Sequence, residues 1–101
     1  MYAFRKIYPL REAIQKKIVC KFYTDEQNLA FVPVSIETSP VYGHNYIVGI
    51  DSDNNPKAIR LSETHKISVL EDSIKITKEM CELISDHLDE IYEEEYNECS
   101  D

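Results

Sequence analysis

Five short segments rich in β-branched and aromatic residues follow one another in the middle of the chain, at 18–23, 29–37, 45–51, 57–61 and 66–70. Segments of this composition favour β-strands, and the turn-forming residues between them, such as those at 52–56, favour tight turns. Pro33 lies inside the second segment and lacks a backbone N–H, so it predicts an edge position or a bulge. The middle of the chain is therefore predicted to form a sheet of short strands joined by hairpins.

Two segments with helical spacing flank these strands. Leu10, Ala13 and Ile14 follow Pro9 at i, i+3 and i+4 spacing and predict a short amphipathic helix over about 9–17, with the proline in its first turn. Thr77 is a favourable N-cap for a second helix over about 78–95. Its apolar stripe consists of Met80, Ile84, Leu88, Ile91 and Tyr92. A short helix, five strands and an acidic amphipathic helix predict a mainly β fold, a small five-stranded barrel of the Sm or SH3-like type whose closure hides the strand edges.

A chain of 101 residues holds a single domain of this size. We expect residues 1–76 to form the barrel with its N-terminal helix, and residues 77–101 to form the acidic helix. The acids at 93–95 oppose the dipole at the end of that helix, which predicts a solvated, fraying terminus. The stripe requires a cover, either the chain's own barrel or a second copy or partner.

Charge is distributed unevenly along the chain, whose net charge is −8. Residues 1–21 carry six basic side chains and one acidic, whereas residues 71–101 carry two basic and twelve acidic. An acidic protein binds nucleic acid poorly without specificity, because phosphate neutralisation supplies most of that affinity. A local basic track is nevertheless predicted from Arg11, Lys16, Lys17 and Lys21.

Several classes of function are disfavoured by the residues present. Two glycines do not make a phosphate-binding loop, and Cys20, Cys81 and Cys99 form no CxxC pair, which favours free thiols in a reducing compartment. The histidines and cysteines show no metal-ligand spacing, and no nucleophile elbow is present. We therefore expect a non-enzymatic, cytoplasmic protein without cofactor, metal or membrane span.

Four stretches of the chain resemble one known family. They are 13–23 (AIQKKIVCKFY), 32–35 (VPVS), 45–51 (NYIVGID) and 59–62 (IRLS), and they resemble the WYL domain family over about residues 10–70. The resemblance implies an Sm-type β-barrel preceded by a helix, which in bacteria usually follows a helix-turn-helix domain and is thought to sense nucleic acid or a nucleotide. Here Asn45 replaces the family's Trp, Ile47 replaces its Leu, and Glu63 stands where a second arginine often follows. The chain is thus expected to be a stand-alone domain of this kind.

Five residues are candidates for a ligand site. Arg60 lies in an apolar strand, where a guanidinium binds phosphate or carboxylate with two parallel hydrogen bonds; the alternative is an outward-facing strand residue. Tyr46 is either a stacking surface or a core residue with its hydroxyl at the rim. His44 is either a donor to an anion or a solvated loop residue. Ser35 and Tyr23, on neighbouring strands, are candidates to complete a polar pocket.

These observations support two hypotheses of function. The first is a regulatory domain that binds an anionic ligand, a short single-stranded nucleic acid or a nucleotide, and modulates a partner. The second is a protein-interaction or homodimerisation module acting through the C-terminal helix. In that case the stripe from Met80 to Tyr92 is the interface, or the acidic face mimics the charge of nucleic acid.

Overall fold

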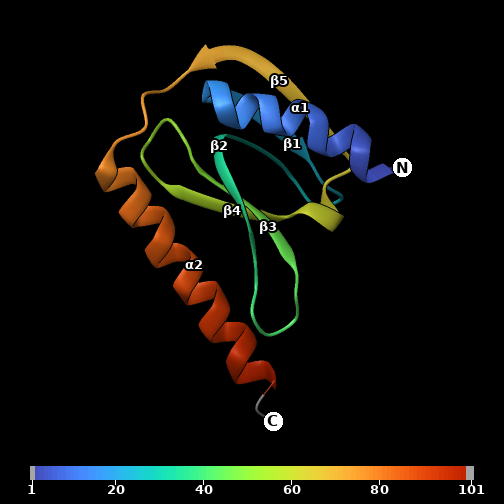
Figure 1. Cartoon of the computed structure of the whole chain (residues 1–101), viewed down its shortest axis with the longest axis vertical. Helices are drawn as coiled ribbons and strands as arrows, with labels where there is room; N and C mark the ends of the chain where they lie inside the picture. The colour runs from blue at the N-terminus through green and yellow to red at the C-terminus, as the bar shows by residue number, and fades with distance from the viewer. Residues whose placement is uncertain (1, 100–101) are drawn as a thin grey trace.

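The computed structural model describes the backbone of residues 2–99 and the side chains of residues 9–99. In chain order (Figure 1) the elements are α1 (Tyr2–Lys16), β1 (Ile18–Tyr23), β2 (Asn28–Thr38), β3 (Asn45–Ile50), β4 (Pro56–Arg60), the 3₁₀ turn η1 (Leu61–Glu63), β5 (Lys66–Ser73) and α2 (Lys78–Cys99). All five predicted strands and both predicted helices are present, so the mainly β fold with two flanking helices is confirmed.

The main corrections concern where the elements begin and end. α1 begins at Tyr2 instead of near residue 9, so Pro9 lies inside the helix and not in its first turn. The prediction relied on the local steric cost of an internal proline, which this helix accommodates. α2 continues to Cys99, beyond the acids that predicted fraying near residue 95, and β5 continues to Ser73.

The strands form one antiparallel sheet in the order β4-β3-β2-β1-β5. β2 is the longest strand, and its register to β3 shifts between Pro33 and Ser35, which confirms the predicted bulge. Gly49 lies opposite Pro33, and a Cβ there would be 2.0 Å from the Val32 carbonyl oxygen, so only glycine permits this close approach of the two strands. Among the described residues β4 and β5 are the unpaired edges of an open sheet, and the closure of a barrel stays a prediction.

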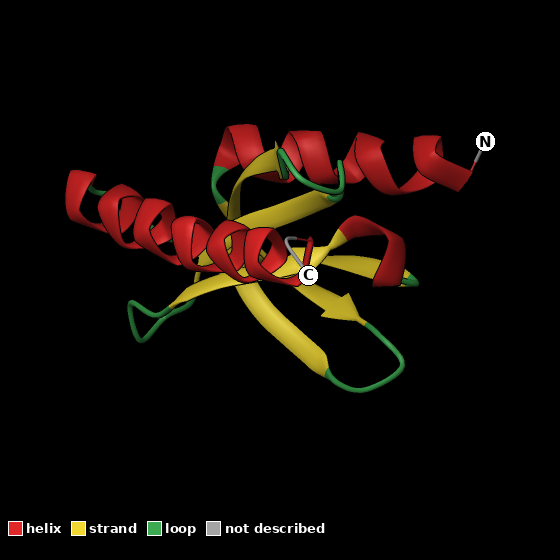
Figure 2. Cartoon of the chain, turned by 90° about the horizontal axis from the view of Figure 1, so that it is seen from below, coloured by secondary structure: helices red, strands yellow, loops and turns green. Residues whose placement is uncertain are grey.

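Each face of the sheet packs against one helix (Figures 1 and 2). On one face α1 covers a core made of Leu10, Ala13, Cys20, Phe22, Phe31, Ile47 and Ile59. On the other face α2 covers Tyr46, Val48 and Ile50 with Ile84 fully inserted, and Met80, Leu88, Ile91 and Tyr92 packed around it. The predicted apolar stripe of α2 is therefore covered by the sheet of its own chain. This is the first of the two alternatives expected, the other being a second copy or a partner.

The sequence also predicted free thiols and no membrane span. All three cysteines are free, with Cys20 buried and Cys81 and Cys99 exposed. In the part of the chain that the structure describes, no helix is both long enough and apolar enough to cross a membrane.

Candidate ligand-binding site

Three of the five predicted ligand residues lie together at the end of the β3–β4 pair. Tyr46 on β3 is directly opposite Arg60 on β4, so both side chains are on the face that α2 covers. His44, just before β3, accepts a hydrogen bond at Nδ1 from the Arg60 Nη2, 3.2 Å away. This bond requires a neutral imidazole, because only the neutral ring has a nitrogen lone pair to offer. The His44 and Tyr46 rings meet edge to face, with centroids 6.4 Å apart.

The Arg60 guanidinium is incompletely satisfied. Its Nη1 is 3.5 Å from Glu63 Oε1 on η1, in an ion pair whose side chains are 37% and 57% exposed. Ion pairs this exposed contribute little to stability. Its Nε is buried and has no hydrogen-bond partner among the described residues. Arg60 therefore has a buried donor without a partner and two weakly held partners, which an anion with two oxygens is able to replace.

Tyr46 carries an interaction that the sequence analysis did not predict. Its hydroxyl donates a 3.0 Å hydrogen bond to Glu95 Oε2 near the end of α2, and the two residues are 9% and 6% exposed. Burial, with the hydrogen bond and charge of Glu95 adding to it, raises the pKa of Tyr46 to about 12. The other carboxylate oxygen of Glu95 is buried and unpaired among the described residues. Glu95 is thus not part of the solvated acidic end predicted at 93–95.

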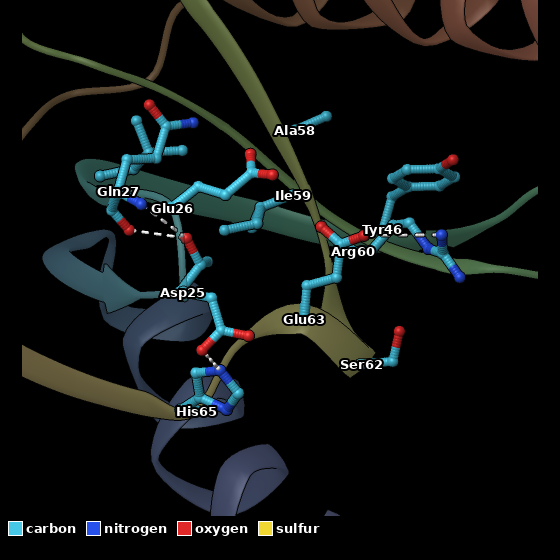
Figure 3. Close-up of a pocket in the computed structure, with 12 residues that line it drawn as sticks. Asp25, Glu26, Gln27, Tyr46, Ala58, Ile59, Arg60, Ser62, Glu63 and His65 are labelled. Atoms are coloured by element: carbon cyan, nitrogen blue, oxygen red, sulfur yellow. Dashed lines mark hydrogen bonds and ion pairs between the residues drawn. The ribbon is translucent and has the colours of Figure 1, made fainter.

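A pocket of about 520 Å³ lies beside Arg60 (Figure 3). One wall comes from the turn between β1 and β2, and the facing wall comes from β4 and η1. The turn is closed by Thr24, whose hydroxyl donates to the Gln27 carbonyl at 2.7 Å. Its residue Asp25 pairs with His65 across the pocket rim at 2.8 Å. The ionisable side chains among the described residues that line the pocket are Asp25, Glu26, Glu63, Arg60 and His65.

The pocket walls are therefore mixed in charge. Among the described residues that line it, Arg60 is the one side chain that is always cationic, and three carboxylates accompany it. A simple anion is attracted to Arg60 and repelled by the rest of the wall. A molecule with an anionic group at one end and hydrogen-bond donors elsewhere matches both parts.

Tyr23 and Ser35 do not line this pocket. Phe22 faces the core under α1, so Tyr23 faces the other way, at the end of β1, where its ring lies 5.4 Å from Lys21 Nζ and 5.6 Å from Lys66 Nζ. Ser35 lies at the β2 bulge and lines a shallow depression beside α1. Ser35 is thus on the α1 side of the sheet. Tyr23 shares the face of Arg60, but β2 and β3 separate its strand from β4, and alternation along the sequence does not give this strand order.

The four predicted basic-track residues do not continue from Arg60. Arg11 and Lys16 are on α1, which covers the opposite face of the sheet, and Lys16 pairs with Glu12 at 2.8 Å. Lys17, just after α1, is exposed, and Lys21 lies beside Tyr23. None of the four lines the pocket beside Arg60, so the predicted track does not extend the Arg60 site.

Within the described residues, no group of three or more His, Cys, Asp or Glu side chains is placed to hold a metal ion. Comparison with protein-family models gives no match, and no curated protein shows significant similarity to the chain.

Proposed function

We propose that this chain is a non-enzymatic regulatory domain that binds a nucleotide, or the end of a short single-stranded nucleic acid, in the pocket beside Arg60. The proposal includes the expectation that the domain is an Sm-like barrel of the WYL kind and that ligand binding modulates a partner. The observation that carries it is Arg60 itself, a partly exposed guanidinium with a buried, unpaired Nε beside a pocket of about 520 Å³. That volume falls within the usual range of small-molecule sites.

The mixed charge of the walls favours a nucleotide over a plain anion. A phosphate group accepts two hydrogen bonds from Arg60, displacing the neutral His44 and the exposed Glu63. Sugar hydroxyls and base amino groups donate to carboxylates such as Asp25 and Glu26 on the facing wall. Tyr46 is too buried to offer its ring face for stacking, so recognition in this proposal is polar.

Two measurements test this function. One is titration calorimetry with adenosine 5′-monophosphate, and the other is fluorescence anisotropy of a labelled single-stranded oligonucleotide across a salt series. A charge-assisted hydrogen-bond pair of this kind contributes about 1.5–3 kcal/mol, so Arg60→Ala is expected to weaken binding by about tenfold or more. Lys57→Ala is the matched control, because Lys57 is on the same strand, is equally exposed and does not line the pocket. Equal affinity of Arg60→Ala and wild type, or no binding by wild type at low salt, overturns the proposal.

The outward face of α2 favours a second candidate function, docking of a basic protein partner. α2 carries nine acidic residues and one basic residue, and its exposed side includes Leu83 (41% exposed) and Tyr96 (65% exposed). A strongly acidic surface attracts a basic partner, and exposed apolar side chains on it add contact area. Capture of binding proteins by the wild type and by the double variant Glu82→Lys, Glu90→Lys tests this candidate, which requires the variant to lose a partner while nucleotide binding is retained.

A further inference from the structure

We propose that Glu95 closes the ligand site from within the chain, and that a bound phosphate competes with its carboxylate and releases the last turns of α2. This inference rests on the proposed nucleotide site and adds its regulation. The Glu95 carboxylate accepts a hydrogen bond from Tyr46, and Tyr46 lines the same pocket as Arg60. Tyr46 is directly opposite Arg60 in the β3–β4 pairing, so the carboxylate bonded to Tyr46 and a phosphate bound to Arg60 lie on the same face of the sheet.

Packing does not account for an acid at position 95. α2 directs its apolar residues at the sheet, and Glu95 follows Ile91 and Tyr92 at helical spacing on that same face. A buried carboxylate that uses only one of its oxygens stabilises a fold less than an apolar side chain of similar size. An acid at this position lowers the free energy of unfolding relative to an apolar side chain. Such a residue is expected in a segment of the fold that must open.

The two halves of α2 are held with different strength. The first half is anchored by Ile84, which is 5% exposed, with Met80 and Leu88 packed beside it. The last turns carry exposed carboxylates, and their last turn has no basic residue to balance the helix dipole. At that end Tyr92 packs against the sheet and Glu95 accepts the hydrogen bond from Tyr46. The end is therefore able to detach while the anchored half stays in place.

Closure also controls the electrostatic environment of the site. α2 carries nine acids and one base, whereas residues 1–77 carry nine acids and ten bases. While the helix end is closed, its carboxylates repel a phosphate that approaches Arg60; once it is released, that repulsion falls. Because linkage is reciprocal, a ligand that opens the helix end binds more tightly to any variant in which that end is already loosened.

The test compares Glu95→Gln with Glu94→Gln, which makes the same change of charge at the next position, where the side chain is exposed. We expect Glu95→Gln to bind adenosine 5′-monophosphate about fivefold or more tightly than wild type, and Glu94→Gln to differ little from it. Hydrogen–deuterium exchange is measured on the same proteins. The nucleotide should speed exchange over residues 92–99 of wild type and leave residues 80–88 unchanged, and protection of β3 checks that each variant is folded.

Two results overturn the inference while leaving the nucleotide site intact. One is equal affinity of Glu95→Gln and Glu94→Gln when Arg60→Ala is weakened; the other is a nucleotide that binds through Arg60 and slows exchange over residues 92–99. Absence of nucleotide binding by both wild type and Glu95→Gln overturns the proposed function and the competition together.

Discussion

Replacement of Tyr46 by Phe isolates the buried hydrogen bond that joins α2 to the sheet. The hydroxyl is lost, the ring stays, and the Glu95 carboxylate is left without a partner among the described residues at 6% exposure. A hydrogen bond to a charged group contributes about 1.5–3 kcal/mol, and an unpaired buried charge costs more still. Because Glu95 lies near the end of a helix that is free to move into water, part of that cost is relieved. We expect Tyr46→Phe to lower the free energy of unfolding by about 2 kcal/mol.

Equilibrium unfolding in urea, followed by circular dichroism, measures this change. Tyr92→Phe is the matched control, since Tyr92 packs on the same face and its hydroxyl forms no hydrogen bond with any described residue; we expect it to cost less than about 0.5 kcal/mol. A double-mutant cycle with Glu95→Gln should give a coupling of about 1 kcal/mol. If Tyr46→Phe costs no more than Tyr92→Phe, the hydrogen bond does not hold the helix end and the reasoning fails.

Three further predictions follow from other parts of the molecule. Gly49→Ala places a methyl carbon 2.0 Å from a β2 carbonyl oxygen, so thermal unfolding should show a loss of about 3 kcal/mol or more. The pKa of Tyr46 is raised to about 12 in the folded chain, whereas a tyrosine hydroxyl in the unfolded chain ionises near 10. The stability contributed by the protonated Tyr46 is therefore complete below pH 10 and is lost as pH rises through 12. The urea midpoints of wild type and Tyr46→Phe should converge over that range. A thiol reagent should label the exposed Cys81 and Cys99 in the native protein, and label Cys20, whose pKa burial raises to about 11, only after unfolding.

The secondary structure was predictable because its signals are local. β-Branched runs between turn formers place all five strands, and a stripe of five apolar residues places α2. α1 is the exception, because a rule about one proline outweighed the helix-forming residues before it. Whether the sheet closes into a barrel depends on contacts between β4 and β5, which follow one another in the chain but lie at opposite edges of the sheet, and no local pattern encodes such contacts.

The site was predictable only in part because it depends on register. Arg60 and His44 were predicted as ligand residues from their residue types, but the contact between them depends on the β3–β4 pairing that sets Arg60 opposite Tyr46. Tyr23 is on the same face of the sheet as Arg60, but β2 and β3 separate β1 from β4, and Tyr23 does not line the pocket. Glu95 was missed because it sits in a run of acids. Its spacing from Ile91 and Tyr92 was the signal that could have marked it as inward-facing.

Adjacent residues of α2 decide whether the stripe belongs to the core of this chain or to an interface. Ile84 is 5% exposed among the residues of β3, whereas its neighbour Leu83 is 41% exposed on the outward side. Truncation of a buried isoleucine costs about 2–5 kcal/mol, so Ile84→Ala should destabilise the monomer by about 3 kcal/mol and Leu83→Ala by less than about 1. Urea midpoints measured over a wide range of protein concentrations complete the test, since an interface makes stability depend on concentration and an internal core does not. Equal costs at the two positions, or a midpoint that rises with concentration and loses that dependence in Ile84→Ala, would assign the stripe to a dimer and remove the basis for an intramolecular closure by Glu95.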